Sequence, residues 1–191
     1  GLAVAGVEAS PEMVAVMRAK PGGDDISVAI GDMADVPVSG PFSLVYLVFN
    51  TLFNLVDAGR QADCFRNVAR VLTPGGAFVL GTFVPDQADF DRHEQLQVRA
   101  VTEDSVRLRV HRYDRSAQTF IRQSITVSEQ GIRLEPFAMR YCWPEQMDEM
   151  AARGGLRLAE RYANWDRQPF DTNSKATSPS TARCKPFWIG R

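Results

Sequence analysis

A short apolar run at residues 44–49, LVYLVF, constrains the fold of this chain more than any other segment. Turn-forming residues precede the run, polar Asn50 follows it, and no polar residue interrupts it. A run this short and uniformly apolar predicts a strand at 42–49 that is buried on both faces, as in a parallel sheet covered by helices. Ligands of open parallel sheets bind outside the carboxyl ends of the strands. We therefore expect residues 48–54 to form one wall of a binding site.

The segments around this run alternate between strand-like and helix-like patterns. Strands are predicted at 2–7, 26–30 and 77–83, and helices between Ser10 and Pro21 and at 61–72. This order predicts an α/β fold, a Rossmann-like and mostly parallel sheet with helices on both faces.

The second half of the chain has a different pattern of predicted elements. Strands at 105–113, 119–128 and 132–141 are separated by short turns, and a helix at 144–154 and strands at 156–165 and 187–189 follow. Short connections favour antiparallel hairpins, so the three consecutive strands predict an antiparallel insert. We divide the chain into an α/β core at 1–85 and 140–191 and, at 86–139, a polar lid with this insert; residues 172–182 are expected to be a loose loop.

Composition narrows the classes of function. The formal net charge of −1 gives no general attraction to nucleic acid or to an acidic membrane, and no apolar run reaches the roughly 20 residues that span a bilayer. Three widely spaced cysteines favour neither a disulfide framework nor a metal site, so no metal ion is expected. With no charged leader in the sequence, we expect a soluble cytoplasmic protein whose partner is a small molecule, and a homodimer is left open.

Acidic residues follow two of the predicted strands. Glu8 comes directly after the first strand, and Asp32 comes after the second. An acid at the end of a strand in such a sheet can accept hydrogen bonds from both hydroxyls of a ribose. Asp32 is suited to an exocyclic amino group of an adenine, with Met33 against the ring. The segment from Phe49 to Phe53 would then border whatever extends from the ribose.

Four segments within residues 2–83 resemble the class I S-adenosylmethionine-dependent methyltransferases. They are VAGVEASPEMV, IGDMADVP, FSLVYLVFNTLFNL and RNVARVLTPGGAFVLGTF. The resemblance implies S-adenosylmethionine as the cofactor, with Glu8 at the ribose, Asp32 beside the adenine and residues 47–50 along the methionine. The cofactor-binding residues that it indicates are Glu8, Ala9, Ser10, Met13, Asp32, Met33, Val48, Phe49 and Asn50.

A looser resemblance covers residues 140–165. The antiparallel insert is similar to the substrate-covering element of small-molecule methyltransferases, including those that act on amino sugars and other natural-product intermediates. The family's first strand and glycine-rich turn have no counterpart after Gly1, and the missing strand would lie between those at 2–7 and 42–49. Unpaired backbone groups at buried strand edges cost about 1–3 kcal/mol each. We therefore expect residues upstream of Gly1, or a partner chain, to supply this strand.

Methyl transfer requires an in-line approach of a nucleophile, and positioning supplies most of the rate, so the sequence assigns no catalytic residue. The candidates on the acceptor side are Asn50, Phe53, His93, His111, Tyr113 and Tyr141. His111 alternates with Arg107 and Arg109, a pattern that predicts an exposed face of a ribbon. Residues 98–143 carry eight arginines against five acids, a pattern that suits an anionic substrate but is equally common on solvated edge strands.

Two other functions remain open at the level of sequence. A nicotinamide-dependent oxidoreductase of the same sheet type also has an acid after its second strand, although the turn at 31–33 and the antiparallel insert fit it less well. A truncated methyltransferase-like module without catalytic activity would explain the missing glycine-rich turn.

Overall fold

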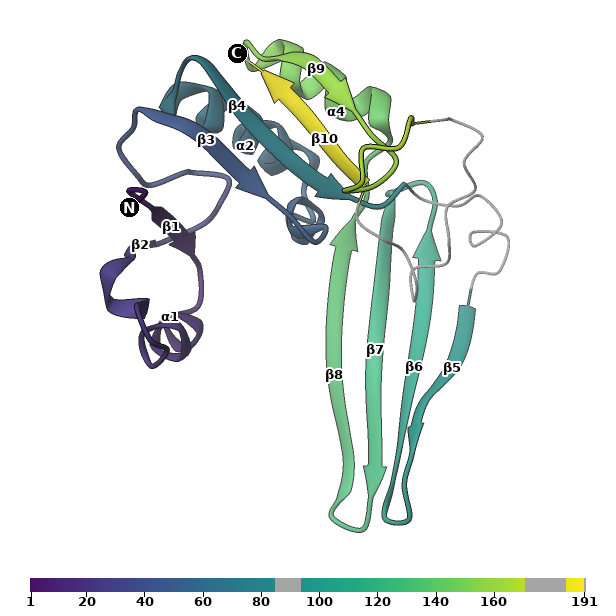
Figure 1. Ribbon diagram of the computed structural model, residues 1–191. Coiled ribbons are helices and arrows are strands. Elements are labelled where there is room, and N and C mark those ends of the chain that lie inside the picture. The colour runs from purple at the N-terminus through teal and green to yellow at the C-terminus, as the bar shows by residue number, and fades with distance from the viewer. Residues whose placement is uncertain (85–93, 171–184, 191) are drawn as a thin grey trace.

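The computed structural model describes residues 1–84, 94–170 and 185–190, whose strands form three sheets (Figure 1). The first sheet is a parallel pair of β1 (Ala5–Glu8) and β2 (Ser27–Ile30). The second has the order β3 (Phe42–Leu47), β4 (Leu72–Thr82), β10 (Lys185–Gly190), β9 (Arg157–Arg161). The third is an antiparallel ribbon of β5 (Glu94–Val101), β6 (Ser105–Asp114), β7 (Thr119–Ser128) and β8 (Gly131–Arg140). The predicted α/β class is confirmed.

The helices begin where the sequence provides caps. In α1 (Pro11–Arg18) the Ser10 side chain accepts a hydrogen bond from the backbone N–H of Met13, as the sequence predicts. The Asp57 carboxylate caps α2 (Ala58–Val71), and Pro144 opens α4 (Pro144–Arg153). Short 3-10 turns, η1 (Gly23–Asp25) and η2 (Thr51–Asn54), precede β2 and follow β3.

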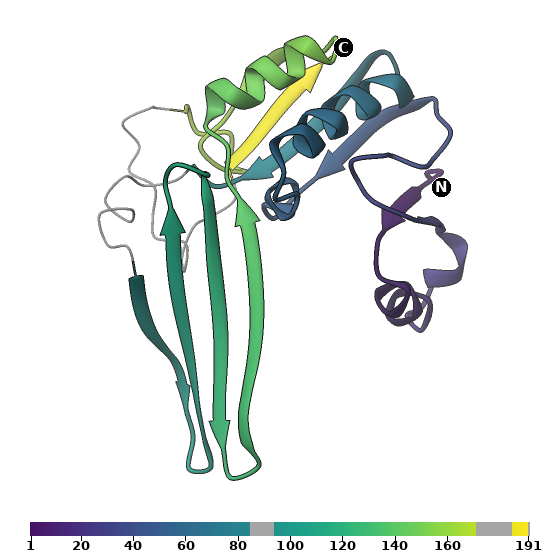
Figure 2. The same ribbon diagram turned by 180° about the vertical axis from the view of Figure 1, so that it is seen from behind.

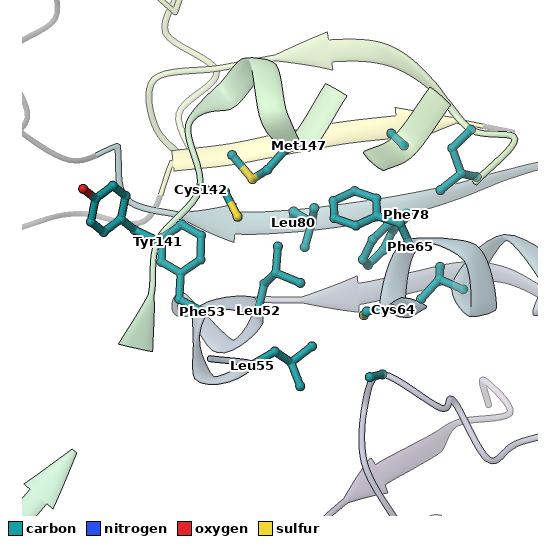
Figure 3. Packing of buried hydrophobic residues seen from close by; sticks show 14 of the residues in the cluster. Leu52, Phe53, Leu55, Cys64, Phe65, Phe78, Leu80, Tyr141, Cys142 and Met147 are labelled. Carbon is teal, nitrogen blue, oxygen red and sulfur yellow. The ribbon is translucent and has the colours of Figure 1, made fainter. Parts of the chain in front are cut away.

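The hydrophobic core lies between α2, α4 and the second sheet, with both helices on the same face of that sheet (Figures 1 and 2). The rings of Phe65 on α2 and Phe78 on β4 meet edge to face, with their centroids 5.6 Å apart. Leu80 and Met147 lie close by (Figure 3). Helix α1 lies beside β1 and β2 and does not cover the opposite face of the second sheet (Figure 1). In the part of the chain that is described, no helix is both long and apolar enough to cross a membrane.

The prediction that β3 is buried on both faces is wrong. Leu44 and Tyr46 are 51% and 63% exposed, because among the described elements α2 and α4 pack on the other face of β3 and no helix covers this one. Within the described residues β3 pairs only with β4, so its other edge also has no partner strand. A cavity of about 300 Å³ separates this edge from β1 and is lined by residues of both sheets, including Gly6 and Tyr46. Because β1 and β3 do not pair with each other, the expectation of a further strand between them stays a prediction.

The antiparallel insert has four strands and not three. The additional strand, β5, pairs with β6 through Leu96↔Val110 and Val98↔Leu108, and its first residues fall in the segment expected to be a lid. Apolar and polar residues alternate only weakly in this polar segment, and pairing with β6 stabilises it as a strand. The last predicted strand is confirmed as β10, which runs antiparallel to β4 and β9. The predicted loop at 172–182 lies outside the described residues.

A buried polar network joins the ribbon to the core. The Gln61 amide, fully buried on α2, donates to the backbone oxygen of Arg140 at 2.8 Å. Its Oε1 atom accepts from the Arg140 guanidinium at 2.6 Å and from the Cys142 thiol at 2.9 Å. Arg140 also donates to Gln118, at the turn between β6 and β7. This network therefore fixes the end of β8 and the β6–β7 turn against α2.

Replacing Gln61 by Leu should lower the free energy of unfolding by about 1–3 kcal/mol, because Arg140 and Cys142 lose a buried acceptor. Urea denaturation of both proteins measures the difference. The control is Arg153→Ala, which removes a 77% exposed partner of Glu149 and should change stability by about 0.5 kcal/mol or less. Equal effects of the two substitutions would contradict this role of the network.

Candidate functional site

The carboxyl ends of β1 and β2 lie side by side and carry the two predicted acids. Glu8 is in register with Ile30, and its backbone oxygen accepts a hydrogen bond from Gly31 N–H at 3.0 Å. Asp32 therefore lies just beyond the residue that pairs with Glu8. The Glu8 carboxylate accepts from the backbone N–H of Ser10 at 2.9 Å through Oε1. This bond fixes the acid at the entrance of α1.

Asp32 is held by two contacts of its own. One oxygen accepts from the backbone N–H of Ala34 at 2.7 Å, and the other lies 3.2 Å from the Arg60 guanidinium on α2. Arg60 also makes two 2.8 Å hydrogen bonds to Asp35, and these bonds hold the pKa of the Asp35 carboxyl below its usual range. Nothing in the sequence singles out Arg60, because its partners become neighbours only when α2 packs beside the end of β2.

The turn after β3 is strained and tied to β4. Phe49 and Asn50 have φ angles of 57° and 64°, a left-handed conformation that is unfavourable for a bulky residue such as Phe49. The Asn50 side-chain oxygen accepts from the backbone N–H of Phe83 at 2.6 Å, and Asn50 N–H donates to Gly81 at 2.8 Å. These bonds hold the strained turn in place, and Phe49 remains 77% exposed.

The structure places the predicted cofactor residues at three strand ends. Glu8 is the last residue of β1, and the others follow a strand: Ala9, Ser10 and Met13 follow β1, Asp32 and Met33 follow β2, and Val48, Phe49 and Asn50 follow β3. The first two groups are brought together by the β1–β2 pair. The third group belongs to a separate sheet, and Met33 lines the cavity between that sheet and the first.

A chain of aromatic rings connects the strand ends to the ribbon. Phe53, in η2, meets Phe83 at a centroid distance of 5.1 Å, and Phe83 meets Phe120 on β7 at 6.2 Å. Phe120 in turn lies 5.7 Å from Tyr113 and 6.4 Å from His111, both on β6. The base of the ribbon is thereby fixed beside the carboxyl ends of β3 and β4.

The other predicted substrate-side residues have different surroundings. Phe53 and Tyr141 are buried in the core cluster (Figure 3), where the ring of Tyr141 lies 5.7 Å from that of Trp143 and burial raises the pKa of the Tyr141 phenol. His93 lies outside the described residues. Their roles at a substrate stay predictions.

The prediction that His111 lies on an exposed face is wrong. Its side chain is 2% exposed, and neither ring nitrogen hydrogen-bonds to any described residue. Burial, followed by the nearby charges of Arg109, Arg122 and Arg99, lowers its pKa to about 4. Alternation along β6 showed correctly that these residues share a face, but it could not show that this face is covered near the base of the ribbon. His111 is therefore a neutral imidazole at neutral pH.

Comparison with known proteins gives concordant matches. Residues 1–76 match the model of a methyltransferase domain. The cypemycin N-terminal methyltransferase of a Streptomyces species is 28% identical over 193 residues, covering 99% of this chain and 74% of the relative. The solved structure of the CcbJ methyltransferase from Streptomyces caelestis is 31% identical with a TM-score of 0.82, covering 98% of this chain and 74% of that one.

A third match shows the same fold at lower identity. It is CalS10, an amino pentose methyltransferase from Micromonospora echinaspora whose structure was solved with S-adenosylmethionine bound. The TM-score is 0.68 at 21% identity, and the alignment covers 98% of this chain and 73% of that one.

The buried His111 should make stability depend on pH. Because its pKa is about 4 in the folded protein and 6.5 in its ordinary state, only the unfolded chain binds this proton between those values. The contribution of the neutral imidazole to the free energy of unfolding is complete above pH 6.5 and is lost as pH falls toward 4. Denaturant unfolding of the wild type and His111→Gln measures this: wild type should lose more stability over that window. An unchanged difference between the two proteins would contradict it.

Proposed function

Because the chain belongs to the class I S-adenosylmethionine-dependent methyltransferases, we propose that it methylates an amino nitrogen of a small natural-product molecule, such as an amino sugar. S-Adenosylmethionine is the methyl donor. The observation that carries this proposal is the strained Phe49–Asn50 turn. It bonds to Phe83 at the aromatic base of the ribbon, and it follows β3, which lines a cavity together with β1. A donor held at the strand ends would present its methyl group toward the ribbon.

Glu8 and Asp32 are the residues we assign to the nucleoside. Glu8 uses Oε1 to accept from Ser10, which leaves Oε2 to accept hydrogen bonds from the ribose hydroxyls. Asp32 is oriented by Ala34 and Arg60 and, with Met33, is assigned to the adenine. Val48, Phe49 and Asn50 are assigned to the methionine end of the donor, because they follow the carboxyl end of β3 next to the aromatic rings.

The acceptor side favours an uncharged amine. Arg109 and Arg122 are close enough to His111 to lower its pKa, and the same charges would lower the pKa of an ammonium group bound there. Only the neutral amine has the lone pair that attacks the methyl group. The pKa of His111 is too low for it to retain a proton at neutral pH, so its proposed role is to accept a hydrogen bond from the amine and orient it. Proximity and orientation then supply most of the rate.

The names of two matched proteins support an amine acceptor. One is an N-terminal methyltransferase, and the other acts on an amino pentose. Family membership favours S-adenosylmethionine over the nicotinamide cofactor that the sequence left open. A measurement of methyl transfer distinguishes an enzyme from a non-catalytic module.

The test combines binding and turnover. Calorimetry with S-adenosylhomocysteine, and with NADH as the control ligand, measures which cofactor class binds. Incubation with S-adenosylmethionine and a panel of amino sugars and short peptides, followed by mass spectrometry, detects an added methyl group on the amine. The proposal expects S-adenosylhomocysteine binding and N-methylated product. Absence of both, or methylation only at oxygen, would overturn it.

The substitution Glu8→Gln should weaken S-adenosylhomocysteine binding by about tenfold or more, because hydrogen bonds from the ribose to a carboxylate are stronger than those to an amide. Calorimetry measures the change. Glu12→Gln is the matched control, since Glu12 lies on the first turn of α1 and contacts only the Ser10 hydroxyl among the described residues. If both substitutions had the same effect, Glu8 would not be the ribose ligand.

A further inference from the structure

The polar face of the ribbon carries a group of cationic side chains near its base. Arg109 and His111 are two residues apart on β6 and therefore share a face. Arg122 on β7 lies directly opposite His111, and Gln97 on β5 lies directly opposite Arg109. Side chains of directly opposed residues have Cβ atoms about 4.5–5.5 Å apart. These four residues, Gln97, Arg109, His111 and Arg122, are called the arginine cluster below.

Among the residues that the structure describes, no carboxylate pairs with the arginine cluster. The acidic side chain that the structure describes on this face is that of Glu135. Its carboxylate pairs with the Arg133 guanidinium at 3.0 Å. Burial, together with the charges of Arg122 and Arg99, lowers the pKa of Arg109, and burial lowers that of Arg122 in the same way. Like charges held this close repel one another, so the arrangement stabilises the protein only when an anion joins it.

Several polar atoms of the arginine cluster are buried and have no hydrogen-bond partner within residues 1–84, 94–170 and 185–190. They are the Nε atoms of Arg109 and Arg122, both ring nitrogens of His111 and Oε1 of Gln97. Buried polar groups in native proteins are usually hydrogen-bonded, and each one left unsatisfied is destabilising. The guanidinium group presents its N–H donors in a planar fork that matches a carboxylate or phosphate. Arg122 is also fixed in orientation, because its guanidinium lies 4.4 Å from the centre of the Phe137 ring.

We propose that Arg109 and Arg122 bind an anionic group of the methyl acceptor, a carboxylate or a phosphate, while its amine lies at His111. This inference rests on the proposed function and adds to it that the substrate is zwitterionic. Arg109 lies farther from Phe120 along the ribbon than His111 does, by two residues of β6 or about 6.8 Å. The anion would therefore lie on the side of the amine that points away from the strand ends.

The same charges have a consequence for the amine. An anion next to the amine would raise the amine's pKa and keep it protonated. The arginine cluster neutralises that anion, so the amine can lose its proton and attack.

The experiment measures anion binding and substrate choice with the whole protein. Inorganic phosphate and acetate are titrated at constant ionic strength, with chloride as the reference, into wild type, Arg109→Gln and Arg122→Gln. Arg107→Gln is the matched control, because Arg107 lies on the same face of β6, two residues nearer the tip than Arg109, and is exposed. Turnover is compared for glucosamine against glucosamine phosphate and for an amino-acid amide against the free amino acid.

The proposal expects phosphate or acetate to bind wild type, each cluster substitution to weaken binding by about tenfold, and Arg107→Gln to have little effect. The anionic member of at least one acceptor pair should have the higher kcat/KM, and this preference should disappear in Arg109→Gln. The pair that responds distinguishes a phosphate from a carboxylate. Without ligand, Arg109→Gln should be at least as stable as wild type, because it removes repulsion. If Arg109 had a purely structural role, Arg109→Gln would instead be less stable than wild type.

Equal binding by Arg109→Gln and wild type, or an equal preference for neutral acceptors, would overturn the proposal. If Arg122→Gln fails to fold, Arg109→Gln and the wild-type titrations still decide it. Calorimetry with S-adenosylhomocysteine separates this inference from the proposed function. Cofactor binding without anion binding would refute the arginine cluster alone, and anion binding without cofactor binding would refute the methyltransferase assignment of the site.

Discussion

The contact between the ends of β3 and β4 and the base of the ribbon is the constraint on which this structure depends. Asn50 bonds to the backbone of Phe83, and the ring of Phe83 lies between those of Phe53 and Phe120. Phe83, the residue just after β4, therefore fixes both the turn that follows β3 and the position of the ribbon. Together with the Gln61–Arg140 network, this contact sets the position of the polar face around His111 relative to the strand ends where the methyl donor is proposed to bind.

The two sides of the site are stabilised in different ways. The proposed donor side uses backbone geometry, a left-handed turn at Phe49 and Asn50 and carboxylates fixed by N–H groups at the start of a helix or turn. The proposed acceptor side uses buried side chains that repel one another, and it includes polar atoms without a hydrogen-bond partner in the described part of the chain. Strain and unsatisfied polar groups of this kind are typical of functional sites, because the ligand completes the interactions that folding leaves unmade.

Sequence patterns predicted most of the elements but not their surroundings. The apolar run of β3 identified a strand and its polar end, yet it could not show that Leu44 and Tyr46 face a cavity, since that depends on which strand pairs with the other edge. His111 was placed on the correct face, while its burial arises from packing at the base of the ribbon. Arg60 carried no local signal, because its ion pairs join segments far apart in the sequence. Local periodicity reports which side chains share a face; tertiary packing decides what covers that face.

The most direct test of the central claim is an experimental structure of the protein with S-adenosylhomocysteine bound. The account predicts that the ribose hydroxyls hydrogen-bond to the Glu8 carboxylate, that the adenine lies beside Asp32 and Met33, and that the sulfur faces Val48–Asn50. A nucleoside bound elsewhere, or Glu8 and Asp32 farther apart than the length of an adenosine, would contradict it.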